Sequence, residues 1–84
     1  MIITRKIVRD QLIAYLNHKI TLELLVDWAE NVIAEGDFEP QDAMLLRDMV
    51  ARIGLADVKA FGLTWEDCYA FLSKLGYQVQ VVTA

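Results

Sequence analysis

The chain has little of what covalent or metal-stabilised folds are built from: its 84 residues include one cysteine, one histidine, one proline and four glycines. A single cysteine cannot form an internal disulfide, which excludes a cystine-stapled secreted scaffold. One cysteine and one histidine also cannot supply the four nitrogen or sulfur ligands of a structural zinc site. These absences exclude two of the usual ways of stabilising a small domain.

Long hydrophobic runs are also missing, since no apolar stretch approaches the roughly 18 residues that cross a membrane. At the amino terminus the charges of Arg5 and Lys6 follow the apolar residues instead of preceding them, which is the wrong order for a signal peptide. We therefore expect a cytoplasmic protein that does not act at a membrane.

Basic side chains are outnumbered, because eight Lys and Arg stand against twelve Asp and Glu, a net charge of −4. This balance argues against binding a phosphate backbone, which needs clustered basic residues, so no nucleic-acid partner is expected. The charge is also uneven along the chain. Residues 1–19 carry a net +3, residues 20–46 hold seven acidic and no basic side chains, and residues 47–84 balance at four of each.

Apolar residues, by contrast, are abundant at 56% of the chain, above the usual share of about 45–50%. A chain of this length forms one domain, here residues 1–84, and a domain so small buries only about 60% of the surface that its unfolded chain exposes. Part of the apolar excess must therefore face solvent or a partner, and we favour a partner.

Four amphipathic segments predict helices over residues 4–16, 21–35, 40–54 and 64–75. Thr4, Thr21 and Thr64 are good amino-terminal caps, and Pro40 suits the first position of a helix. Apolar residues at helical spacing form a stripe on each segment. In the second and fourth segments these stripes are Leu22, Leu25, Val26, Ala29, Val32 and Ile33, and Trp65, Cys68, Tyr69, Phe71, Leu72 and Leu75.

After Gly76 the pattern alternates with a period of two and is rich in valine, so residues 77–83 are predicted to form a strand. A lone strand leaves its backbone groups unpaired. It therefore pairs either with residues 1–3 or with its copy in a second chain. The expected fold is mainly α: a compact four-helix bundle with a short C-terminal β-strand.

Cys68 and His18 are the only residues from which a cysteine nucleophile and its base could be built. Cys68, however, lies on an apolar stripe, and His18 lies where a helix ends, so we expect no enzyme activity and no cofactor. The alternative is a small metal-binding protein or enzyme that uses the acidic segment 35–42. That segment does not fit a twelve-residue calcium loop, and no metal ligands are assigned.

The second segment also carries a candidate partner-binding surface. Leu24 and Trp28 form an i, i+4 pair beside its core stripe, and acidic side chains surround them. Tryptophan is common at binding interfaces and is also an ordinary residue at the edge of a small core, so both roles stay open for Trp28 and the core role is favoured. An apolar surface ringed by acids suits a basic protein partner. The candidate residues are Leu24, Asp27, Trp28, Glu30, Asn31 and Glu35.

Residues 15–21 (YLNHKIT), followed by residues 24–29 (LLVDWA), give the chain a resemblance to small bacterial immunity proteins of the colicin D type. The resemblance covers roughly residues 4–35, and the C-terminal strand departs from it. It implies an acidic helical bundle that binds and blocks a basic RNase toxin. We therefore expect a non-catalytic protein-binding module, either an inhibitor of this kind or a homodimeric interaction domain.

Overall fold

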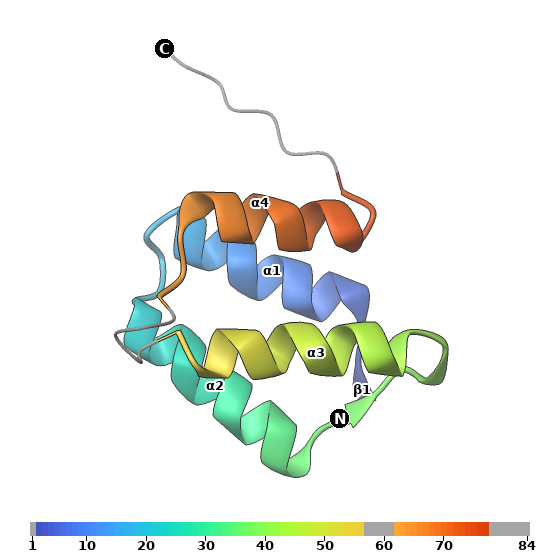
Figure 1. The fold of residues 1–84 in the computed structure, drawn as a ribbon. Coiled ribbons are helices and arrows are strands. Elements are labelled where there is room, and N and C mark those ends of the chain that lie inside the picture. The colour runs from blue at the N-terminus through green and yellow to red at the C-terminus, as the bar shows by residue number, and fades with distance from the viewer. Residues whose placement is uncertain (1, 57–61, 78–84) are drawn as a thin grey trace.

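The computed structural model describes residues 2–56 and 62–77, and this part of the chain is mainly helical, as predicted (Figure 1). No helix within these ranges is long and apolar enough to cross a membrane. In chain order the elements are β1 (Ile2–Ile3), α1 (Arg5–Leu16), α2 (Leu22–Glu35), β2 (Asp37–Phe38), the 3-10 turn η1 (Pro40–Asp42), α3 (Ala43–Gly54) and α4 (Trp65–Lys74).

Three helices begin at the threonines that the sequence predicts as caps. The hydroxyls of Thr4, Thr21 and Thr64 each accept a hydrogen bond from the backbone N–H three residues further along. At α4 the Asp67 carboxylate in turn accepts from the Thr64 N–H at 3.0 Å, which completes a capping box. These starts depend on local hydrogen bonds only, and local sequence therefore predicts them well.

Helix α1 ends in a left-handed turn centred on His18, whose φ is 60°. The His18 N–H donates to the Tyr15 carbonyl at 3.0 Å, and the Lys19 N–H donates to the Ala14 carbonyl at 2.8 Å. This pair of bonds is the Schellman arrangement, in which glycine is the usual residue at the left-handed position. His18 is thus fixed by the backbone of a helix end.

Helix α4 ends in the same way with Gly76, whose φ is 95°. The Tyr77 N–H donates to the Leu72 carbonyl at 3.0 Å, so Tyr77 closes the helix. Tyr77 was predicted as the first residue of the terminal strand, and that part of the prediction is wrong because the helix end uses its N–H. Residues 78–83 of the predicted strand, with their pairing to residues 1–3 or to a second copy, lie outside the described residues.

A two-stranded parallel sheet, which the sequence pattern does not predict, joins the amino terminus to the segment after α2. Ile2 pairs with Asp37 and Ile3 with Phe38, and the Glu39 N–H donates to the Ile3 carbonyl at 2.9 Å. Strands of two residues are too short to show the alternation that identifies a strand. Their pairing is set by tertiary contacts, which bring β1 alongside the end of α2.

The core lies between the helices. Helix α2 packs most extensively against α3, and α1 lies beside α4 (Figure 1). Stripe residues from all four helices meet there, together with one residue of β1. The buried cluster comprises Ile3, Val8, Leu12, Leu25, Ala29, Val32, Leu46, Met49, Val50, Ile53, Cys68, Leu72 and Leu75.

Two residues that the sequence places on core stripes are exposed instead. Ile33 is 45% exposed because the C-terminal end of α2 diverges from α3 (Figure 1). Trp65 is 61% exposed and is the first residue of α4. Helical side chains lean toward the amino terminus, and no turn of α4 precedes Trp65 to cover its indole.

Candidate functional site

The candidate residues predicted from sequence all lie on α2, but they do not share one face. Leu24, Trp28, Asn31 and Glu35 follow an i, i+4, i+7, i+11 spacing and therefore form one face, which we call the α2 binding face. Leu24 is 55% exposed, whereas Trp28 is half-buried and packs against the core.

The other two candidates are exposed acidic side chains outside this face. At about 100° per residue, Asp27 lies next to the α2 binding face and Glu30 is turned about 120° away from Leu24. The structure therefore brings four of the six candidates together, and it separates Glu30 from them.

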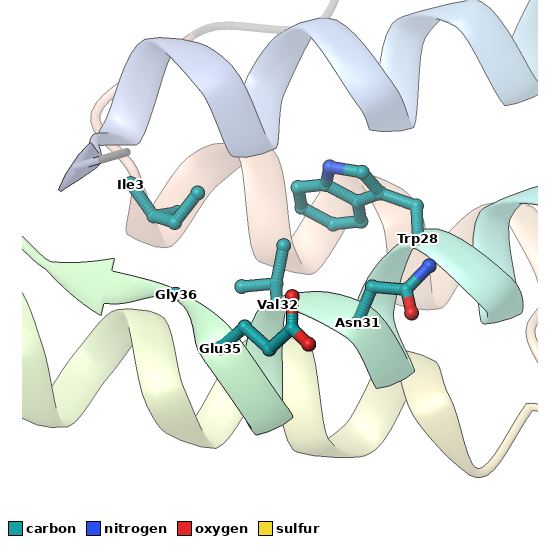
Figure 2. A pocket seen from close by; sticks show the side chains of 6 residues that line it. All are labelled: Ile3, Trp28, Asn31, Val32, Glu35 and Gly36. Carbon is teal, nitrogen blue, oxygen red and sulfur yellow. The ribbon is translucent and has the colours of Figure 1, made fainter.

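An open pocket of about 260 Å³ lies at the C-terminal end of the α2 binding face. Ile3 and Trp28 lie on opposite sides of it, Val32 lies between them, and the Glu35 and Asn31 side chains lie along one edge (Figure 2). The broad side of the Trp28 indole is seen in this view. Gly36 completes the lining.

The pocket depends on the close approach of β1 to the end of α2. A Cβ atom placed on Gly36 would lie 2.7 Å from the Val32 carbonyl oxygen and 3.3 Å from the Ile3 Cγ1 atom. The first distance is shorter than real contacts allow, so only glycine fits without a shift. Gly36 therefore lets β1 follow α2 closely enough for Ile3 to form a wall.

The lining combines two chemical characters. Ile3, Val32 and the Trp28 ring are apolar or aromatic, whereas Glu35 and Asn31 place polar groups at the edge. Trp28 packs against the core, which is one of its two predicted roles, and it also lines the pocket.

Sequence reasoning did not identify Ile3, Val32 or Gly36 as site residues. Val32 was assigned to the core stripe, where it is indeed buried, and Gly36 only to the end of a helix. Ile3 reaches the pocket through the pairing of β1 with β2. No local signal reports such a contact between distant parts of the chain.

The acidic segment 35–42 is divided among different structural roles. Asp42 accepts two hydrogen bonds from Arg5, from Nε at 2.8 Å and from Nη2 at 2.7 Å, and this ion pair lowers the pKa of the Asp42 carboxyl. Glu39 accepts from Gln41, and Glu35 lines the pocket. Among the residues that the structure describes, no three Asp, Glu, His or Cys side chains gather around a possible metal position.

The two arginines of α1 are likewise engaged in contacts within the chain. Arg5 also donates from Nη1 to the Leu75 carbonyl at 3.0 Å, so one guanidinium joins α1, η1 and the end of α4. Arg9 pairs with Asp10 at 2.8 Å and lies 4.8 Å from the ring centroid of Tyr77.

Cys68 is completely buried, and burial raises the pKa of its thiol to about 11. The thiol therefore stays protonated at neutral pH, and a protonated thiol is a poor nucleophile. His18 is exposed at the end of α1. In the structure Cys68 is a small core residue and His18 is part of a helix end.

Comparison of the chain with protein-family models, curated proteins and solved structures gave no match.

Proposed function

We propose that this chain is a non-catalytic protein-binding module that docks a basic protein partner on the α2 binding face. The observation that carries the proposal is the pocket, because it sets the half-buried Trp28 ring beside the side chains of Glu35 and Asn31. Leu24 lies one turn before Trp28 on the same face and extends the apolar area. Aromatic and aliphatic anchors next to a polar rim are typical of binding surfaces.

The charge distribution supports a basic partner. Residues 20–46 contain seven acidic and no basic side chains, and Asp27 and Glu35 flank the exposed apolar groups. A surface of one sign attracts a partner of the opposite sign over a Debye length, and so raises the association rate. Together with the resemblance to immunity proteins, this favours an inhibitor that covers a basic surface of a toxin-like protein.

Photo-crosslinking identifies the partner and tests the face at once. A photoreactive amino acid replaces Leu24 in one variant and Ala51, which is exposed on α3, in the control. In the cells that make the protein, we expect position 24 to crosslink to a protein with a basic domain and position 51 not to do so. Crosslinks of equal yield at both positions, or a crosslink from position 24 only to a second copy, would contradict the proposal.

Binding of the purified partner then tests the energetics. Leu24→Ala removes apolar contact area and is expected to weaken binding by about 1–2 kcal/mol, which is about 5- to 30-fold in Kd. Met44→Ala is the matched control, because it removes an exposed apolar side chain from α3. Equal effects of the two substitutions would show that the α2 binding face is not the interface.

A further inference from the structure

We propose that the pocket at the end of the α2 binding face receives one arginine side chain of the partner. The inference rests on the proposed function, since it names the group that a basic partner places there. Three observations carry it: an aromatic ring and two aliphatic side chains line the pocket, a carboxylate and an amide lie along one edge, and the volume is about 260 Å³.

The volume and shape fit one long side chain. The pocket is open and measures about 260 Å³, below the roughly 300–1,000 Å³ of pockets that enclose drug-sized ligands, so one long side chain is enough to fill it. Ile3 and Val32 are only 1% and 7% exposed and close the inner side of the pocket, so the methylene groups of an arginine would rest mainly on the half-buried Trp28. The Trp28 indole offers a flat ring on which a guanidinium can stack.

The polar edge supplies hydrogen-bond acceptors for that guanidinium. Within the described residues, neither the Glu35 carboxylate nor the Asn31 amide takes part in a hydrogen bond or ion pair. A guanidinium has five N–H donors in one plane, so it can stack on Trp28 and donate to Glu35 at the same time. Binding therefore adds an ion pair without breaking one inside the domain.

Arginine fits this combination better than lysine does. A guanidinium is planar and weakly hydrated, whereas an ammonium is compact and strongly hydrated and gains less from contact with a flat ring. Two of the four arginines of the chain lie over aromatic rings in the same way. Arg9 lies 4.8 Å from the Tyr77 ring centroid, and Arg47 lies 5.6 Å from that of Phe38.

A titration followed by NMR tests the inference on the full chain. The probes are three blocked tripeptides that have arginine, lysine or norleucine between two glycines, added at millimolar concentration to ¹⁵N-labelled protein at low salt. We expect the arginine peptide to shift the Trp28 indole N–H and the Asn31 amide saturably. The Trp65 indole, which is 61% exposed on α4 and outside the pocket, is the internal reference and should not move.

Two variants locate the binding groups. Glu35→Gln removes the carboxylate and is expected to raise the Kd of the arginine peptide about three- to fivefold, within the range for an exposed ion pair. Trp28→Phe keeps an aromatic ring in the core but weakens cation–π attraction, so it should raise the same Kd about two- to threefold. Glu30→Gln is the control, because Glu30 is an exposed acid on α2 that does not line the pocket.

The outcomes separate this inference from the proposed function. Equal shifts with arginine and norleucine, equal affinity for arginine and lysine, or equal effects of Glu35→Gln and Glu30→Gln each overturn the arginine pocket. If position 24 still crosslinks to a basic partner in those cases, the proposed function stands and only the inference fails. If position 24 yields no basic partner while the arginine peptide shifts Trp28, the pocket binds arginine and the proposed function fails.

Discussion

At the end of α1, a histidine adopts the left-handed backbone conformation that a glycine adopts at the end of α4. His18 has a φ of 60° and Gly76 a φ of 95°. For a residue with a Cβ atom this conformation costs about 1–2 kcal/mol. Glycine avoids that cost but loses part of the advantage, because its unfolded chain has more conformational entropy. We expect His18→Gly to raise the free energy of unfolding by up to about 1 kcal/mol, measured by urea denaturation.

The reciprocal change at α4 is the control. Gly76→Ala is expected to lower the free energy of unfolding by about 1–2 kcal/mol, because its added Cβ would lie 3.6 Å from the Arg5 Nη1 atom, an ordinary contact, and only the backbone is strained. If both substitutions changed stability in the same direction, backbone conformation would not be what distinguishes the two positions.

The Cys68 thiol offers a second test at the scale of single residues. It is fully buried, and its pKa is raised to about 11. We expect it to be unreactive toward a disulfide reagent at pH 8 in the folded protein and to react at once in denaturant. The measurement is the absorbance of the thiol that the reagent releases. Rapid reaction in the absence of denaturant would contradict the burial of Cys68.

At the scale of elements, the sequence predicted the helices better than the sheet, for a physical reason. A helix start such as Thr64 with Asp67 is specified by residues three apart, and a core stripe is specified by residues three and four apart. The pairing of Ile3 with Phe38 joins residues that are distant in the chain, and two-residue strands have no period. The exposure of Ile33 depends on how α2 diverges from α3, which no single-helix pattern contains.

The contact between β1 and the end of α2 gives a prediction about Gly36. A Cβ there would lie 2.7 Å from the Val32 carbonyl oxygen, so Gly36→Ala must displace β1 or the last turn of α2. We expect a loss of about 1–3 kcal/mol in the free energy of unfolding, measured by urea denaturation.

Gly54→Ala is the matched control for Gly36→Ala. A Cβ on Gly54 would meet the Ala29 Cβ at 3.8 Å, an ordinary contact, at the end of α3. Because alanine favours helix by up to about 1 kcal/mol over glycine, this variant should be unchanged or slightly more stable. A Gly36→Ala protein as stable as Gly54→Ala would show that β1 does not pack closely on α2.

The Arg5–Asp42 ion pair connects α1 to η1 and makes stability depend on pH. The pKa of Asp42 is lowered in the folded protein by its hydrogen bonds to Arg5. A carboxyl whose pKa is lowered in the folded protein stabilises the fold at pH values above its ordinary pKa. This contribution is lost as the pH falls through the lowered pKa.

We therefore expect Asp42→Asn to reduce the melting temperature at neutral pH, and the difference from the wild-type protein to shrink as the pH falls below about 4. Melting curves recorded between pH 7 and pH 2 test this. Asp48→Asn, an exposed acid on α3, should leave the melting temperature nearly unchanged at neutral pH. A difference between Asp42→Asn and wild type that stayed constant down to pH 2 would contradict the role of the ion pair.

At the scale of the whole molecule, the arginines of α1 and the acidic side chains of α2 have different surroundings. The arginines of α1 pair with acids inside the domain, as Arg5 does with Asp42 and Arg9 with Asp10. The exposed acids of α2, such as Asp27, Glu30 and Glu35, face solvent. The exposed surface along α2 is therefore acidic, although the chain carries eight basic residues.

The candidate site was partly predictable. Helical spacing was enough to place Leu24 and Trp28 beside the core stripe, with Asn31 and Glu35 on the same face. It was not enough to place Ile3 against them, because that contact passes through a sheet of two-residue strands. The sequence therefore indicated one wall of the pocket, and tertiary structure supplied the other.

The proposed function requires that a basic partner bind the α2 binding face. A map of backbone amide shifts in the ¹⁵N-labelled chain, recorded with the partner that crosslinks to position 24, tests it most directly. We predict that the largest changes fall on residues 24–36 and on Ile3, and that α3 residues such as Met44 and Asp48 stay unchanged. Changes centred on α3 or α4, with the Trp28 indole signal unmoved, would contradict the claim.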